Sequence, residues 1–525
     1  MPSPQPASAR ATPAPAASRP RGGRRPARSD PPPLRVLLAS SEVEPYAKTG
    51  GLADMTAALG KYLARAGHQV GIVTPLHRRM SPALAKNLQP FAWSLDLPLG
   101  TAVHHAGVKI AQPEPNLTIY FVDAPQFYDR AGLYLDPASK SDYPDNAERY
   151  LFLSKAVVNL ARYLPWKPEL VHVHDWHTAM VPLLIRHQAW HEGWFDAPRT
   201  VLTIHNLAPQ GRCHASKFAL TNLPAYYFHP DAAEFWGDFN PLKTGLVFAD
   251  AITTVSPTYA REILTPDYGE GLDGLLRQRQ SVLTGILNGV DYEEWRTVGN
   301  PYLPAPYSVE DLAGKAANKA ALQAELGLPV RADVPLFSTI SRLETQKGVD
   351  LLLAALEEML ATGLQYVLLG TGRADFEAGF RALAARFPRQ VAVRIGYDRA
   401  LAHRIEAACD FYLMPSRFEP CGLNQMYSLR YGAVPVVRAT GGLQDSVTDL
   451  REDALRADGI KFQAPTAAAL AKAIRKALAL WREPALLDRY RRQGMTRDFS
   501  WQRSVARYEA LYRRLLGHAT GQPVA

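Results

Sequence analysis

Short apolar runs alternate with amphipathic stretches along the first half of the chain. The apolar runs lie at 34–40, 70–73, 117–122, 170–173, 201–204 and 251–255. Continuous apolar runs of this length are typical of strands that helices cover on both faces, as in a parallel sheet. Helical patterns lie between them at 51–66, 146–164 and 178–191. This half therefore predicts a doubly wound α/β domain.

The alternation stops at 288–335, where loops and one Ala-rich helical pattern at 312–326 take its place. It restarts with apolar runs at 336–340, 366–370, 391–395, 411–414 and 434–437, and with a helical pattern at 348–361. We therefore predict two Rossmann-like domains, 34–287 and 336–495, joined by a hinge at 288–335 and followed by a helical segment at 496–518.

The net charge of +9 is concentrated at one end of the 525-residue chain. Residues 1–33 hold six Arg and one Asp, which leaves only +4 for the rest. So mild a charge does not indicate a nucleic-acid partner. Residues 1–33 also hold ten prolines and no apolar cluster, so we predict a disordered leader. An organelle transit peptide is the alternative, but the proline density disfavours the amphipathic helix that such peptides form.

The composition also indicates in which cellular compartment the protein is found. Hydrophobic residues make up 47% and charged residues 21% of the chain, as in ordinary globular proteins. No apolar run reaches the roughly 18 residues that a membrane-spanning helix needs, so no membrane partner is expected. Cys213, Cys409 and Cys421 are too few and too scattered for a disulfide framework or a zinc site. We therefore predict a cytoplasmic protein without a resident metal or cofactor.

The most informative motif follows the first predicted strand. It is the run Lys48-Thr49-Gly50-Gly51-Leu52-Ala53-Asp54, at the start of an amphipathic helix. Two adjacent glycines allow close approach of a ligand to the backbone, and the helix behind them directs free N–H groups at it. Lys48 adds a positive charge beside that position. The motif is neither a P-loop nor a G-x-G-x-x-G sequence, and it predicts a phosphate or diphosphate site.

The second half carries matching anion signals. Arg342 and Lys347 follow the strand at 336–340, and the carboxyl ends of strands are where α/β sheets bind ligands. Later, the run Thr440-Gly441-Gly442-Leu443 repeats the Gly-Gly-Leu pattern of the first half. One glycine motif in each domain, together with two cations, predicts a diphosphate held between the domains.

Glu419 and Cys421 follow the strand at 411–414. At this strand end the Glu419 carboxylate is placed to accept hydrogen bonds from sugar hydroxyls or to offset positive charge in an oxocarbenium-like transition state. Cys421 has no identifiable partner base, so we favour packing or substrate contact over covalent catalysis.

Taken together, these motifs show that the chain resembles the bacterial glycogen synthases and plant starch synthases, which are retaining, ADP-glucose-dependent glycosyltransferases. The resemblance spans about 36–516 and rests on eight motifs in order: 48–54, 172–177, 203–208, 254–259, 287–291, 341–348, 416–423 and 440–443. It implies the GT-B fold, two Rossmann-like domains facing across a cleft. It also implies that the terminal helix crosses back to the first domain, and that the partners are ADP-glucose and an α-1,4-glucan such as glycogen.

The resemblance also implies roles for individual residues. The implied catalytic residues are Lys48, His205, Arg342, Lys347 and Glu419. Further substrate contacts are implied for Gly50, Gly51, Asp54, Asp175, Trp176, His177, Asn288, Tyr397, Cys421, Gly422, Leu423, Thr440, Gly441, Gly442 and Leu443. Among these, Tyr397 matches an adenine-stacking position, and Gly441 to Leu443 would supply N–H groups to phosphate. Core packing is the alternative for Trp176 and Tyr397.

Two positions depart from the family pattern. Pro209 stands where the family has Tyr, and Tyr427 stands where related transferases place a second Glu. Two other functions stay open: a transferase of the same fold that uses UDP-glucose, and a glucan-binding protein without catalysis. The second would tolerate loss of Lys48, Arg342, Lys347 or Glu419, and all four are present.

Overall fold

The computed structural model describes residues 1–3 and 31–517, in two units, Met1–Pro33 and Leu34–Ala525. Most of the predicted leader, residues 4–30, therefore lies outside the described residues. Within the described ranges, no helix is long and apolar enough to cross a membrane. Both large sheets belong to the second unit, so the boundaries predicted at 287, 335 and 495 stay predictions.

The first large sheet has nine strands in the described part of the chain. In spatial order they are β11 (Leu283–Gly285), β10 (Ala251–Thr254), β7 (Arg199–Ile204), β6 (Leu170–His174), β1 (Arg35–Ala39), β2 (Gln69–Pro75), β5 (Leu117–Asp123), β4 (Ala102–Glu114) and β3 (Gln89–Leu99). All neighbours from β11 to β5 are parallel, whereas β4 and β3 add an antiparallel hairpin at one edge.

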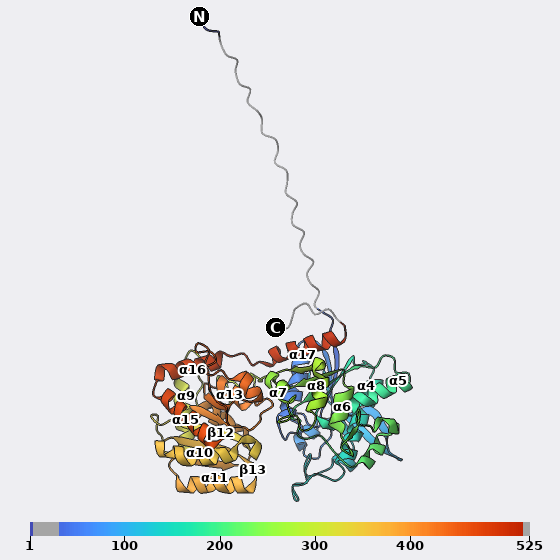
Figure 1. Cartoon of the computed structure of the whole chain (residues 1–525), viewed down its shortest axis with the longest axis horizontal. Coiled ribbons are helices and arrows are strands. Elements are labelled where there is room, and N and C mark those ends of the chain that lie inside the picture. The colour runs from blue at the N-terminus through green and yellow to red at the C-terminus, as the bar shows by residue number, and fades with distance from the viewer. Residues whose placement is uncertain (4–30, 518–525) are drawn as a thin grey trace. The chain divides into compact units, whose positions relative to one another are not determined.

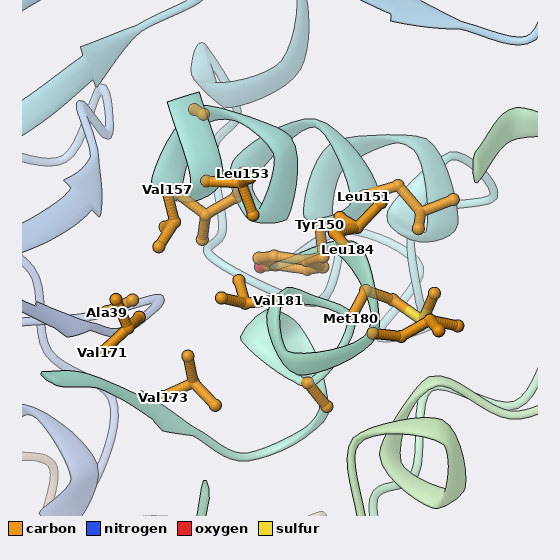
Figure 2. Packing of buried hydrophobic residues seen from close by; sticks show 14 of the residues in the cluster. Ala39, Tyr150, Leu151, Leu153, Val157, Val171, Val173, Met180, Val181 and Leu184 are labelled. Atoms are coloured by element: carbon orange, nitrogen blue, oxygen red, sulfur yellow. The ribbon is translucent and has the colours of Figure 1, made fainter. Parts of the chain in front are cut away.

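Helices cover both faces of this sheet, as the apolar runs predicted. On one face α4 (Asn146–Tyr163) and α5 (Val181–His191) pack on the central strands, and Figure 2 shows Tyr150 and Val181 of these helices near Val173 of β6. On the other face α1 (Gly51–Arg65) and α17 (Trp501–Leu515) form a second cluster with β1 and β2. Alternate residues of β1 point to the two faces, so every residue of this strand after Arg35 is apolar and buried.

Helix α17 links the end of the chain to the first sheet. Its residues Trp501, Val505, Tyr508, Leu511 and Tyr512 are buried in the same cluster as α1 and β1. In Figure 1 α17 accordingly lies beside the elements of the first half of the chain. The apolar positions recur at helical spacing along 501–512, which explains why one stripe of this helix is buried.

The second large sheet has six described strands, and all its neighbours are parallel. In spatial order they are β14 (Val391–Ile395), β13 (Gln365–Gly372), β12 (Leu336–Leu343), β15 (Phe411–Met414), β16 (Val434–Arg438) and β17 (Ile460–Phe462). Helices α10 (Val349–Met359), α11 (Ala374–Arg386) and α15 (Ala467–Trp481) cover one face, and α9 (Ala313–Glu325) and α12 (Arg399–Ala408) cover the other.

The remaining α-helices and strands lie in the connections. They are α2 (Pro82–Ala85), α3 (Pro125–Tyr128), α6 (Pro241–Phe248), α7 (Pro257–Glu262), α8 (Asp273–Gln278), α13 (Asn424–Arg430), α14 (Gly441–Ser446), α16 (Pro484–Thr496), and the two-stranded sheet β8 (Glu234–Phe235) with β9 (Asp238–Phe239).

Each large sheet has one point at which the strand order changes direction. In the first sheet it lies between β1 and β6, and in the second between β12 and β15. The loops that leave the carboxyl ends of two such strands diverge to opposite faces, and the crevice between them is the usual ligand site of doubly wound sheets. The predicted site residues follow these strands and their neighbours.

Candidate functional site

The loop from β1 to α1 places the first predicted motif at the switch point of the first sheet. Gly50 precedes the helix without a side-chain cap, and Asp54 lies in its first turn. The Lys48 ammonium lies 2.6 Å from Asp54 Oδ1. Burial favours the neutral amine of Lys48, but the Asp54 and Glu44 carboxylates outweigh that effect and raise its pKa. Lys48 is therefore a cation held at the mouth of the crevice.

This loop touches the loops of the second sheet. A Cβ built on Gly51 would lie 3.8 Å from Leu423 Cδ1, and Arg399 Nη1 lies 3.8 Å from Glu44 Oε1. The first glycine motif and the segment that follows β15 are therefore neighbours, as a site shared by the two sheets requires.

Glu42 is a site residue that sequence analysis missed. It is buried two residues before Glu44, and it accepts hydrogen bonds from Thr49 N–H, Thr49 Oγ1 and Tyr134 OH. Burial raises the pKa of Glu42 to about 7, although those hydrogen bonds oppose the shift. Glu42 fixes the turn that leads to Gly50. An acidic residue just after the central strand was the available signal.

Asp175, Trp176 and His177 follow β6 on the other side of this switch point. Asp175 has a left-handed backbone (φ 55°), and its Oδ1 accepts the His205 N–H at 2.7 Å. Burial raises the pKa of Asp175 to about 7. Gly211 (φ +67°) lies against Trp176, where an added Cβ would meet the indole at 2.1 Å. Trp176 is thus fixed by the loop that carries the unusual Pro209.

Buried histidines connect β6 to His205, which follows β7. His174 Nδ1 lies 3.1 Å from His205 Nε2, and the rings of His174 and His172 lie 4.4 Å apart. Burial lowers the pKa of His205 to about 3, and burial and neighbouring imidazoles lower the pKa of His174 well below its usual value. Both rings are therefore neutral at physiological pH. His177 is buried against Tyr134 and Tyr150, and burial lowers its pKa as well.

The second switch point holds the predicted cations. Lys347 Nζ lies 2.6 Å from Glu419 Oε2, which also accepts the Ser416 hydroxyl at 2.9 Å. Arg342, at the carboxyl end of β12, is exposed, and no side chain or backbone group in residues 1–3 and 31–517 binds its guanidinium. One cation is thus held in place by Glu419, and the other is available to an anion.

Cys421 is buried in a small apolar cluster with Val255, Val290 and Met426. Burial raises the pKa of its thiol to about 12, which leaves no thiolate for nucleophilic attack. Gly422 and Leu423 follow it and lead into α13, with Leu423 against Gly51.

The 440–443 motif lies at this site, but its N–H groups are occupied. Gly441 N–H donates to the Glu262 carboxylate at 3.1 Å, and Gly442 N–H donates to the Glu419 carbonyl at 3.0 Å. Gly441 has φ +44°, and a Cβ there would meet the Glu419 carbonyl at 2.0 Å, so the glycines serve close packing of backbone on backbone. The predicted contact from these N–H groups to phosphate requires the Glu262 carboxylate to release Gly441 N–H and the Glu419 carbonyl to release Gly442 N–H.

Glu262 belongs to a reciprocal pair of caps. It accepts from the start of α14, while Asp445 of α14 accepts from Thr258 N–H at 2.7 Å and Thr258 Oγ1 at 2.6 Å, at the start of α7. Burial raises the pKa of Glu262, although these hydrogen bonds oppose the shift. No sequence pattern marked this pair, because its partners are 178 to 187 residues apart.

Tyr397 and Asn288 lie at the edges of the site. Tyr397 follows β14 and is 78% exposed, so its ring face is available for stacking and does not pack in a core. Asn288 is 5% exposed, and its Oδ1 has no hydrogen-bond partner within the described residues. Tyr427, at the position of the absent second Glu, stacks on Trp295 at 3.7 Å.

Two cavities adjoin the predicted residues. One of about 290 Å³ is lined by Asn206, Tyr259, Asp267, Tyr268, Glu270, Arg417 and Phe418. The lining of the other, of about 250 Å³, includes Asp54, Asn288 and Leu423 together with apolar residues of α1, β2 and β5. Two residues that line the first cavity are sequence neighbours of predicted site residues, since Asn206 follows His205 and Phe418 precedes Glu419.

Comparison with known proteins identifies the family. The sequence model of starch synthase catalytic domains matches residues 35–278, and the model of group 1 glycosyl transferases matches residues 327–494. A glycogen synthase of Anaeromyxobacter sp. (strain Fw109-5) is 49% identical over 483 residues, which cover 92% of this chain and 99% of that protein. The glycogen synthase of Myxococcus xanthus (strain DK1622) is 46% identical over 485 residues, 92% of this chain and 100% of that protein.

Solved structures agree. The catalytic domain of starch synthase IV from Arabidopsis thaliana, bound to ADP and acarbose, has a TM-score of 0.85 at 33% identity and covers 93% of this chain and 100% of its own. Sucrose-phosphate synthase from Thermosynechococcus elongatus, at 19% identity and a TM-score of 0.58, shares the fold. The chain belongs to the glycogen and starch synthase family, and the predicted GT-B fold and glucosyltransferase class are confirmed.

Proposed function

We propose that the protein transfers glucose from ADP-glucose to the non-reducing end of an α-1,4-glucan with retention of configuration, as a glycogen synthase. The observation that carries the proposal is the pairing of the two switch points. Lys48 and the Gly50-Gly51 turn come from the first sheet, Arg342 and Lys347 come from the second, and Gly51 lies next to Leu423. A nucleoside diphosphate sugar carries two phosphates and a sugar that such a divided site can hold.

The relatives support the choice of donor and acceptor. The bacterial relatives carry the name glycogen synthase, and starch synthase IV was solved with ADP. The exposed ring of Tyr397 suits stacking on the adenine. UDP-glucose is the competing donor, and the assay below separates the two.

Departure of the diphosphate is the step that the cations assist. As the bond from the anomeric carbon to the phosphate oxygen breaks, negative charge grows on the phosphate and positive character on the sugar. Arg342 has no protein partner in the described chain, and Lys347 is held by Glu419, so both cations stand ready before the reaction. Preorganised charges of this kind stabilise the transition state without reorganising. The proposal assigns no metal or cofactor.

Retention follows from attack on the same face as departure. The acceptor hydroxyl attacks the anomeric carbon while its proton passes to the departing phosphate oxygen, so no protein nucleophile is used. Cys421 fits this, since its buried thiol is protonated. The proposal assigns His205 to bind the glucose and the Glu419 carboxylate, which Lys347 holds, to offset the positive character of the sugar. The protein contributes positioning and electrostatics.

We assign the end of the acceptor glucan to the cavity of about 290 Å³, whose lining includes Asn206 and Phe418, the sequence neighbours of His205 and Glu419. Its lining combines Tyr259, Tyr268 and Phe418 with the carboxylates of Asp267 and Glu270. Aromatic rings and carboxylates together suit the apolar faces and hydroxyl groups of a glucan chain. We also propose a cytoplasmic location, which three free thiols support.

Initial rates with glycogen as primer test the proposal. With ADP-glucose and UDP-glucose at equal concentrations, we expect kcat/KM to be at least tenfold higher for ADP-glucose, about 1.4 kcal/mol. Lys48→Ala should lower the rate strongly, because it removes the charge of the first motif. A preference for UDP-glucose would assign a different donor. Binding of glycogen without turnover of either donor would indicate a glucan-binding protein instead.

A further inference from the structure

His174 is the one protein group within the described residues that binds the imidazole ring of His205. It ends β6, is fully buried, and lies 3.1 Å from His205 Nε2 through its Nδ1. The register of β6 and β7 pairs His174 with Thr203, which brings His205 to the same edge of the sheet. The Asp175 side chain holds the His205 backbone N–H, so ring and backbone are fixed separately.

One proton must lie between the two rings. Both imidazoles are neutral, because burial lowers the pKa of each far below physiological pH. Each ring therefore carries one N–H, and two arrangements satisfy the contact. Either His174 Nδ1–H donates to His205 Nε2, or His205 Nε2–H donates to His174 Nδ1.

The second ring nitrogen of His174, Nε2, decides between these two proton arrangements. His174 Nε2 is buried and has no hydrogen-bond partner in the described chain. If His205 were the donor, His174 would carry its proton on Nε2, as an unpaired buried N–H. If His174 is the donor, Nε2 is only an unpaired acceptor. Unpaired buried N–H groups are rarer in native structures than under-satisfied acceptors, and the arrangement with His174 as the donor avoids an unpaired N–H.

We propose that His174 is a positioning residue that holds His205 in the Nδ1–H tautomer, so that His205 presents an N–H donor to the glucosyl substrate. His205 is partly exposed, and its Nδ1 has no partner among the described residues. The ring therefore donates to a sugar oxygen and does not accept from a hydroxyl. This role rests on the proposed function, since it names the atom through which that site binds glucose.

The ring of His174 packs beside that of His172, whose two ring nitrogens are both hydrogen-bonded. His172 Nδ1 lies 2.7 Å from Tyr512 OH of α17, and His172 Nε2 lies 2.5 Å from Thr203 Oγ1. Tyr512 thus supports His172 without touching His174 or His205 by any hydrogen bond in the described part. It offers a matched control.

The first test is spectroscopic and needs no activity. The full chain is labelled with ¹⁵N in its histidines, and the His205 and His174 signals are assigned from spectra of His205→Gln and His174→Asn. We expect the ligand-free protein to show a protonated, pyrrole-type Nδ1 and an unprotonated, pyridine-type Nε2 in His205. The reverse pattern in His205 would overturn the proposal.

The second test is kinetic. His174→Leu removes the donor, and we expect kcat with ADP-glucose to fall about tenfold, the equivalent of one hydrogen bond of roughly 1.4 kcal/mol, with a smaller change in KM. His174→Asn keeps an amide donor near the Nδ1 position and should restore most of that loss. Tyr512→Phe should stay within about twofold of wild type.

The outcomes separate this role from simple support of the fold. Equal impairment of the Asn and Leu variants, or a Leu variant with full kcat, would contradict the positioning role. If the wild-type protein turned over neither donor, the proposed function would fail, while the tautomer would still be decided by the spectrum.

Discussion

Replacement of Lys347 by Ala gives the sharpest test of the catalytic assignment. Lys347 lies in the turn between β12 and α10, and its ammonium is 2.6 Å from Glu419 Oε2. In the proposed mechanism, the change removes a cation that assists departure of the phosphate. It also leaves the buried Glu419 carboxylate without its counter-charge, beside an anionic donor.

The expected loss can be worked out in two ways. Two unit charges 4 Å apart interact by about 4 kcal/mol at an effective dielectric constant of about 20. Removal of one preorganised contact to a charge that develops in the transition state typically costs about 2.7–4 kcal/mol. Both correspond to a fall in kcat of roughly 10²–10³. The KM for ADP-glucose should change less, because the charge is larger in the transition state than in the bound donor.

The assay is the initial rate of glucose incorporation into glycogen at saturating ADP-glucose, with circular dichroism to check folding. Arg386→Ala is the control, since it removes an exposed cation of the same domain that pairs with Glu357. Lys347→Arg should keep more activity than Lys347→Ala. If Lys347→Ala retained more than about a tenth of the wild-type kcat, the proposed role of this cation would be refuted.

Three further results are expected. Tyr397→Ala should raise the KM for ADP-glucose about tenfold in steady-state assays, because stacking on a base is worth about 1–3 kcal/mol, and an unchanged KM would remove Tyr397 from the site. In urea unfolding, Gly211→Ala should lower the free energy of unfolding by about 2–4 kcal/mol, because the added Cβ strains the left-handed backbone and overlaps with Trp176. The decrease should clearly exceed that of Gly237→Ala, since Gly237 also has a positive φ but has open space around its Cβ position. Burial raises the pKa of Glu406 from 4.5 to about 8, so folding takes up a proton at this carboxyl group, and the stability that this proton contributes is lost as the pH rises from about 4.5 to 8. Glu406→Gln cannot titrate, so the free energy of unfolding of this variant should fall by about 2–3 kcal/mol less than that of the wild type between pH 5.5 and 7.5. An unchanged pH dependence would contradict the raised pKa.

Most strands of both sheets were predictable because helices cover them on both faces. A strand such as β1 is then apolar at every position after its first residue, Arg35, and such continuous apolar runs are readily found in a sequence. The hairpin of β3 and β4 was missed for the opposite reason. It extends the sheet at one edge, its burial alternates along β4, and no continuous apolar run marks it.

The site could be predicted where charged or reactive side chains lie at or just after the end of a strand. Lys48 and Glu419 lie in segments that leave the carboxyl ends of strands, Arg342 lies near the end of β12 itself, and the structure brings these strand ends to the two switch points. Contacts between distant segments were not predictable. Nothing in the sequence shows that Glu262 occupies the N–H of Gly441, or that His174 binds His205, because these contacts depend on how the elements pack.

The nature of the new glucosyl bond tests the central claim most directly. The protein is incubated with ADP-[¹⁴C]glucose and glycogen, and the labelled glycogen is digested with β-amylase, which removes maltose from the non-reducing ends of α-1,4 chains. The proposed function predicts that the label enters glycogen with an equal release of ADP and returns as maltose. Label that resists this digestion, or ADP release without incorporation, would contradict retaining transfer to the non-reducing end of an α-1,4-glucan.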